Sequence, residues 1–290
     1  RELVATPLYL VALGRLNPSD ALPSTRADLI AALMKAHQDR VVDHDEFHEV
    51  LRGLHTPVLQ ALAVALVERG TTALSEGEAR AAITQASEAA RAAGALGAAL
   101  EPFAVLRALV DHHILVRSDR TTSAVYTLPH EQIQEWLASF RVEERALAAR
   151  GDAEAERRFL AEIVDRPVWT ESILFAIERM GRASDEALAA ASRMICRAFG
   201  IDRLLAARMV ARGGDRLWER IAPVVSQFLE DWTRAGRSVS GSDLAAFLCA
   251  TARSELRGRL WNLLQADPKL EPQDLDVAGL HALLQSDWDE

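Results

Sequence analysis

Apolar residues recur at helical spacing along most of the chain. Leu59, Leu62, Ala63 and Leu66 follow the i, i+3, i+4, i+7 pattern that gives a helix one apolar face. Capping residues and glycines mark the helix ends, and residues 75–78 (SEGE) have the form of a capping box. In the first half, the pattern predicts two helices within 1–40, the second starting at 24 or 25, and further helices at 57–70, from 75, at 101–113 and from 129–130.

The hydrophobic period changes from 3.6 to 2 in two short segments. These segments, ILVRSD (114–119) and SAVYTL (123–128), predict two strands joined by a turn at 119–122. We expect strands nowhere else in the chain. Three helices followed by a β-hairpin is the order of a winged-helix domain.

After residue 142 only helical patterns appear, separated by glycine-rich turns. They predict helices at 152–164, 168–181, 185–199, 201–212, 215–235, 243–256, 258–266 and near 274–287. No repeat period is evident, so the region is typical of an irregular α-solenoid. The expected fold class is mainly α, with a helical subdomain at 1–45, a winged-helix domain at 46–141 and a helical repeat region at 142–290.

The composition is that of an ordinary globular protein, with 290 residues of which 49% are hydrophobic and 26% charged. The longest apolar stretch, at 92–100, is about half the ~20 residues that a membrane-spanning helix needs, so we expect no membrane association. Cys196 and Cys249 lie in helical patterns and are expected to be reduced core residues. No signal peptide opens the chain, and it starts at Arg1 rather than Met. We therefore expect a piece of a longer cytoplasmic protein.

The net charge of −9 does not favour nucleic-acid binding. In a winged helix the third helix would read DNA. Here that helix is the one predicted at 101–113, and we expect Phe103 to lie on its inward, apolar face. The outward residues of that helix and of the hairpin carry both signs: Glu101, Arg107, Asp111, His112, Arg117, Asp119 and Arg120. This mixed surface offers too little positive charge to dominate phosphate contacts, so DNA binding is not expected.

Sequence motifs give no basis for catalysis by this chain alone. No G-x-x-x-x-G-K-[ST] phosphate loop occurs, and no G-x-S-x-G motif is present. His44 and His48 are spaced i, i+4, but a third metal ligand is not evident and the segment is interpreted as a solvated helix start. We therefore expect no catalytic residues and no metal site.

Several segments together resemble the C-terminal part of the nucleotide-binding module of NACHT-type STAND NTPases, the class with NLR architecture. The most specific of them is HEQIQEWLA (130–138), although Leu128-Pro129 departs from the family pattern just before it. The segments that carry the resemblance are ATPLYLVALGRL (5–16), LPSTRADLIAALMKAHQDR (22–40), VYTLPHEQIQEWLASF (125–140) and PVWTESILFAIERM (167–180).

The resemblance implies roles for two residues. Pro7 matches the proline that packs on adenine, and a first-turn helix proline is the alternative. His130 matches the winged-helix histidine that contacts the β-phosphate of ADP in the closed state, and a capping or structural histidine is the alternative. Glu135 and Trp136 are interpreted as packing residues.

The function that the resemblance implies is the regulatory and sensor portion of an ATPase switch. ATP or ADP with Mg would bind the complete protein, with the phosphate-binding residues outside this chain. Its partners would be its own upstream NTPase core, further copies in an active homo-oligomer and a protein trigger, and the biology would be anti-phage defence. The alternatives are a STAND-type transcriptional regulator, or a helical scaffold that binds protein and no nucleotide.

Overall fold

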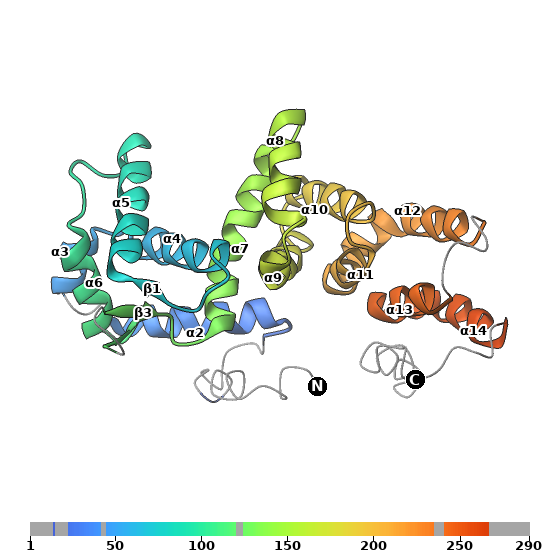
Figure 1. Ribbon diagram of the computed structural model, residues 1–290, viewed down its shortest axis with the longest axis horizontal. Coiled ribbons are helices and arrows are strands. Elements are labelled where there is room, and N and C mark those ends of the chain that lie inside the picture. Colours follow the sequence, from blue (N-terminus) through green and yellow to red (C-terminus); the bar gives the residue numbers. More distant parts are fainter. Residues whose placement is uncertain (1–13, 15–22, 42–44, 120–123, 235–240, 267–290) are drawn as a thin grey trace. The chain divides into compact units, whose positions relative to one another are not determined.

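The computed structural model describes Gly14 and residues 23–41, 45–119, 124–234 and 241–266 (Figure 1). It divides into two compact units, the first of residues 1–144 and 167–176 and the second of residues 145–166 and 177–290. The fold is mainly helical with one small sheet, as the sequence predicts. No helix among the described residues is long and apolar enough to cross a membrane. The first of the two helices predicted within 1–40, which includes Leu3 and Leu13, and the helix predicted near 274–287 lie outside the described residues.

The first unit contains the winged-helix order of elements that the sequence predicts. Its elements are α2 (Arg26–Val41), α3 (Asp45–Leu51), α4 (His55–Glu68), β1 (Leu74–Ser75), α5 (Glu76–Ala92), α6 (Pro102–Asp111), β2 (Val116–Ser118) and β3 (Val125–Thr127). The helix α7 (Glu131–Ala148) starts in this unit and ends in the second.

The sheet has three antiparallel strands in the order β1-β3-β2. The predicted hairpin forms, with Arg117 opposite Tyr126. The expectation that strands occur only there was wrong, because Leu74 and Ser75 pair with Tyr126 and Val125. A strand of two residues is too short to show a period of two, so the sequence pattern could not reveal it.

Residues 75–78 form the capping box that the sequence predicts. The Ser75 hydroxyl accepts the N–H of Glu78, and the Glu78 carboxylate accepts the N–H of Ser75 at 2.8 Å. These hydrogen bonds hold the pKa of Glu78 below its ordinary value. An N-cap of this kind contributes roughly 1 kcal/mol, so the start of α5 is specified by local sequence.

Two side chains of α6 are placed differently from the prediction. Phe103, expected to face inward, is 51% exposed. At 100° per residue it lies about 160° around the helix from Val105, which is fully buried, so it faces away from the core. His112, expected to face outward, packs edge-on against Phe47 with ring centroids 5.0 Å apart.

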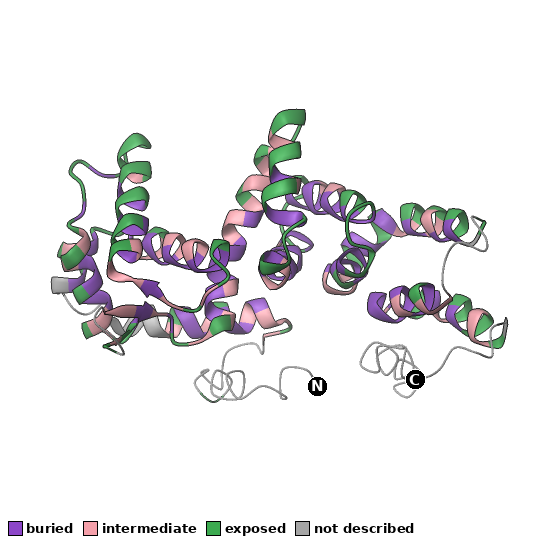
Figure 2. Cartoon of the chain, viewed as in Figure 1, coloured by how far each residue is buried: buried purple, intermediate pink, exposed green. Residues whose placement is uncertain are grey.

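The second unit is built from helices that follow one another closely, and the described residues after 150 form no strand. They are α8 (Ala153–Phe159) with its π-helical continuation (Leu160–Val164), α9 (Thr170–Met180), α10 (Asp185–Ala198), α11 (Arg203–Arg212), α12 (Gly214–Arg234), α13 (Gly241–Thr251) and α14 (Arg257–Ala266). The helix α9 follows a 3-10 turn (Pro167–Trp169) and starts in the first unit. Every residue from 172 to 178 is buried, which makes α9 one of the most enclosed helices (Figure 2).

Local side chains and close backbone contacts fix the boundaries of these helices. Asp152, Ser184 and Asp202 each cap the following helix by accepting a backbone N–H. A Cβ atom at Gly181 would overlap the carbonyl oxygen of Gly213, so the turn after α9 lies directly against the turn before α12. Only glycine fits at position 181 without moving one of these turns.

Arg253 joins the end of α11 to the start of α12. Its guanidinium donates hydrogen bonds to the carbonyls of Val210 (3.2 Å) and Gly214 (2.8 Å) and pairs with Asp215 at 2.9 Å. It also lies over the Trp218 ring, 5.4 Å from the centroid. Since Arg253 is buried, these partners are what make its burial tolerable.

Both cysteines are reduced, as expected, but only Cys249 is a core residue. The prediction for Cys196 was wrong, because its side chain is exposed. The buried stripe of α10 runs through Ala191, Met194, Ile195 and Ala198. Cys196 lies beside this stripe rather than on it.

Candidate functional site

Charged residues from three distant segments meet inside the first unit. Arg26 is the first residue of α2, where the Thr25 hydroxyl caps the helix by accepting the N–H of Asp28. Glu135 lies on α7 and Glu171 on α9. We call Arg26, Glu135 and Glu171 the charge cluster.

Arg26 and Glu171 form the ion pair of the charge cluster. Both terminal nitrogens of Arg26 lie 3.4 Å from Oε2 of Glu171. The Arg26 side chain is 13% exposed and that of Glu171 30% exposed, so water screens the pair only partly. The guanidinium also lies over the ring of Phe175, 5.0 Å from its centroid.

Glu135, the third residue of the charge cluster, forms no ion pair with any described residue. Burial is the main cause that raises its pKa to about 8, and the nearby carboxylates of Glu171 and Glu131 raise it further. Arg26 acts in the opposite direction. Glu135 is therefore mainly protonated at neutral pH, and a rise in pH adds a negative charge beside Arg26 and Glu171.

His130, the candidate phosphate contact, caps the start of α7. Its Nδ1 atom accepts the N–H of Gln132 at 3.2 Å, and its side chain is half-buried. Because Nδ1 is the acceptor, a neutral His130 carries its proton on Nε2 and can donate it to an anion. Capping and anion contact are thus compatible at this residue. Pro7, the candidate adenine contact, lies outside the described residues.

The residues around His130 fit a nucleotide phosphate in part. One imidazole donor at a helix N-terminus can contact a phosphate oxygen. The adjacent Glu131 carboxylate is a like charge that opposes an anion there. A single donor of this kind does not hold a polyphosphate, so most of a nucleotide's contacts would have to come from other residues.

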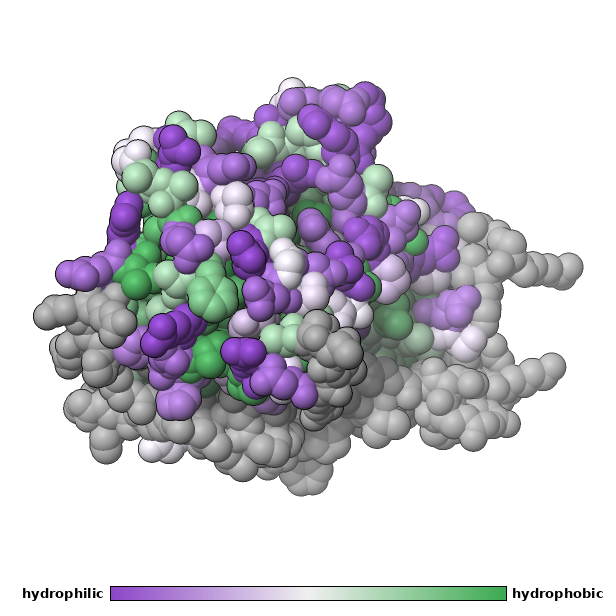
Figure 3. Space-filling view, turned by 60° about the vertical axis from the view of Figure 1, so that its left-hand side comes forward, coloured by the Kyte–Doolittle hydropathy of each residue, from purple (hydrophilic) through white to green (hydrophobic). Residues whose placement is uncertain are grey.

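The surface of the winged helix that would read DNA is electrically balanced. Arg107 pairs with Asp111 at 3.5 Å and Arg117 pairs with Asp119 at 3.3 Å. Phe103 adds an exposed apolar side chain to α6. On the face that Figure 3 presents, hydrophilic and hydrophobic residues are interleaved. Arg120, also expected on this surface, lies outside the described residues.

The histidine pair of residues 44 and 48 can be placed only in part. His48 is exposed on α3, while His44 lies outside the described residues. His55, which follows α3, has a lowered pKa, mainly through burial and also through the charge of His48. In the part of the chain that the structure describes, no group of three His, Cys, Asp or Glu residues could hold a metal ion.

The charge cluster was not predicted from the sequence. Glu135 was expected to be a packing residue, and no role was expected for Arg26 or Glu171. Trp136 does pack, since it is buried and lies edge-on to Phe140 with ring centroids 5.1 Å apart. The available signal was a carboxylate at position 135, flanked by the apolar positions Ile133 and Trp136 of the predicted helix.

Comparison with known proteins adds no assignment. No protein-family model matches the sequence. No curated protein matches it significantly.

Proposed function

We propose that this chain is the regulatory and sensor portion of a STAND-type ATPase switch. In this proposal the winged helix closes over a nucleotide held by an NTPase core elsewhere in the polypeptide. ADP holds the closed state, and ATP exchange on sensing a protein trigger opens it. The open protein forms a homo-oligomer in the cytoplasm and acts in antiviral defence.

The observation that carries the proposal is the meeting of three of the four segments that resemble the family. Residues of 22–40, 125–140 and 167–180 contribute Arg26, Glu135 and Glu171 to one cluster. Segments chosen only for their sequence resemblance would not have to pack together. Their packing is what a winged helix integrated with the flanking helical segments requires.

Bound ADP would supply the phosphate oxygen that His130 contacts in the closed state. The role of this chain would be one hydrogen bond from Nε2 of His130 to a phosphate oxygen. The half-buried position of His130 limits competition from water, and the bond from Gln132 fixes the ring. A hydrogen bond to a charged group contributes roughly 1.5–3 kcal/mol.

The test compares two substitutions of His130 in the complete natural protein. His130→Ala removes both the cap and the anion contact, whereas His130→Asn keeps a good N-cap and shortens the side chain. Both variants should retain ADP less well through purification and should signal without a trigger. The closed-to-open equilibrium should shift by about 10- to 150-fold, the factor that corresponds to the lost hydrogen bond.

The Asn variant separates the two roles. If His130→Asn retains ADP like the wild type and only His130→Ala fails, capping is the sole role of His130. Wild-type ADP occupancy in both variants would contradict the assigned contact. A complete protein without a phosphate loop would contradict the switch itself and favour the helical scaffold.

A further inference from the structure

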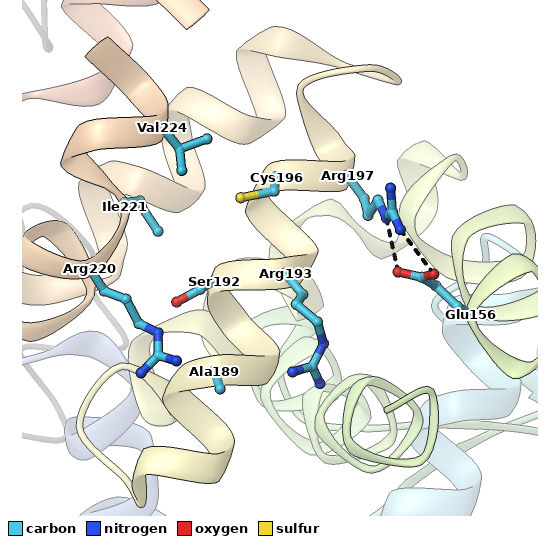
Figure 4. Close-up of a pocket in the computed structure, with 9 residues that line it drawn as sticks. All are labelled: Glu156, Ala189, Ser192, Arg193, Cys196, Arg197, Arg220, Ile221 and Val224. Atoms are coloured by element: carbon cyan, nitrogen blue, oxygen red, sulfur yellow. Dashed lines mark hydrogen bonds and ion pairs between the residues drawn. The ribbon is translucent and has the colours of Figure 1, made fainter. Parts of the chain in front are cut away.

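The second unit contains a groove between α10 and α12. Its volume is about 300 Å³, at the lower end of the range of roughly 300–1,000 Å³ found for small-molecule sites. The groove is lined by one face of α10, by one face of α12 and by Glu156 of α8 (Figure 4). All of these residues belong to the second unit.

The charged groups that line the groove are predominantly positive. Three guanidinium groups and one carboxylate give a net charge of +2, in a chain whose net charge is −9. Arg197 and Glu156 satisfy each other, with Nε to Oε1 at 2.9 Å and Nη2 to Oε2 at 3.2 Å. The excess charge therefore belongs to Arg193 and Arg220.

Arg193 and Arg220 have unused hydrogen-bond donors. Nη2 of Arg193 is shielded from solvent and has no hydrogen-bond partner among the residues that the structure describes. Among the described residues, Arg220 makes no hydrogen bond or ion pair. A shielded guanidinium nitrogen without an acceptor is costly, and native structures normally provide such a group with a protein, solvent or ligand partner. In Figure 4 the two guanidinium groups lie on either side of Ala189, at the end of the groove away from Val224.

The rest of the groove is apolar. Ile221 is buried and Val224 is 43% exposed, so an apolar surface remains open to a ligand. The Ser192 hydroxyl donates to the carbonyl of Leu188 at 2.8 Å, which leaves its oxygen as an acceptor only. The groove thus offers guanidinium donors at one end and an apolar surface at the other.

We propose that this groove binds a small organic anion, a molecule that carries a carboxylate or phosphate on an apolar body. Guanidinium forks match the geometry of both oxyanions, and the apolar surface of α12 would take the body of the ligand. The volume suits a small ligand of this kind. This site does not depend on the switch proposed above.

Cys196 provides a direct way to measure occupancy. Its thiol is exposed and lines the groove, whereas Cys249 is fully buried. Although Cys196 is exposed, the protein groups around it shield its thiol in part and raise its pKa, so alkylation at neutral pH is slow enough to follow. The rate of Cys196 alkylation by iodoacetamide, read by mass spectrometry, therefore reports on the groove, and Cys249 reports on unfolding.

The probes are 4-phenylbutyrate, its neutral amide and inorganic phosphate, at constant ionic strength. We expect 4-phenylbutyrate to slow the alkylation saturably, the amide to have little effect, and phosphate to protect only weakly because it has no apolar body. Arg193→Gln and Arg220→Gln should each raise the apparent dissociation constant at least about tenfold. Arg91→Gln, which changes the net charge equally in the first unit, should not change it.

Three results would overturn the proposal. The first is that 4-phenylbutyrate does not slow Cys196 alkylation saturably. The second is that the neutral amide slows it equally, and the third is that neither arginine substitution changes the apparent dissociation constant. Arg220 is exposed, so its substitution tests the site even if Arg193→Gln perturbs the packing of α10.

Discussion

Arg26 and Glu171 are 145 positions apart in the sequence, yet both terminal nitrogens of the arginine lie 3.4 Å from one carboxylate oxygen of the glutamate. The pair ties the first turn of α2 to the first turn of α9. Burial and the Glu171 carboxylate raise the pKa of the nearby Glu135, whereas Arg26 lowers it. Arg26 is thus the one cation among the three residues of the charge cluster.

Arg26→Ala should destabilise the first unit. Removal of the guanidinium leaves the Glu171 carboxylate without its cation, and we expect a loss of about 2 kcal/mol because the pair is partly shielded from water. Hydrogen exchange of the amides of 170–176 measures the effect locally. A double-mutant cycle with Glu171→Ala isolates the interaction, and a coupling energy near zero would contradict it.

Glu135 should make the stability of the first unit depend on pH. Its pKa in the folded state is about 8 and its ordinary value is 4.5. Between these values the unfolded chain has released the proton and the folded chain retains it, so stability falls as pH rises from about 4.5 to about 8. Outside this window Glu135 contributes no slope.

Glu135→Gln should abolish this part of the pH dependence and leave the protein more stable than the wild type at alkaline pH. Free energies of unfolding at about pH 5 and about pH 9 measure the difference. Glu88→Gln, at an exposed position on α5, is the matched control and should follow the wild type. Parallel curves for wild type and Glu135→Gln would contradict the prediction.

Arg253 should stabilise the second unit through its buried hydrogen bonds more than through its ion pair. Arg253→Met leaves the carbonyls of Val210 and Gly214 without their donor and should cost about 3 kcal/mol in denaturant unfolding. The Asp215 side chain is 93% exposed, so Asp215→Ala should cost less than about 1 kcal/mol. Equal costs for the two substitutions would show that the ion pair dominates.

Duplex DNA should bind no more tightly than a non-specific ligand, with a dissociation constant of roughly 10⁻⁴–10⁻⁶ M or weaker at physiological salt. The reason is that Arg107 and Arg117 are each paired with an aspartate. Fluorescence anisotropy across a salt series measures the affinity. Nanomolar, sequence-specific binding that is lost in Arg107→Ala would instead favour the transcriptional regulator.

Most of the secondary structure could be predicted because its signals are local. The caps at Ser75, Ser184 and Asp202 and the apolar stripes of the helices act within a few residues. The short strand β1 could not be found in this way, because Leu74 becomes part of a sheet only when Tyr126 lies opposite it. Its assignment depends on a partner more than 50 positions away.

The candidate site was predictable only at single residues. His130 was found by resemblance, and its capping bond was an alternative open from the sequence. The charge cluster was missed because a glutamate at position 135 has the same sequence signature whether it faces water or Arg26. Its raised pKa arises from burial by other elements, which the residues around it do not encode.

The first unit is built from two separate stretches of the sequence, and this affects the order in which the protein can fold during synthesis. Residues 167–176 belong to it, while 145–166 belong to the second unit. When the whole winged helix has left the ribosome, Glu171 has therefore not yet been synthesised, and Arg26 has no ion-pair partner at position 171. Domains generally fold in order from the N-terminus as they emerge. Here the first unit can be completed only when the second has already begun to appear, so the nascent chain exposes the incomplete face of α2 for longer than a contiguous domain would.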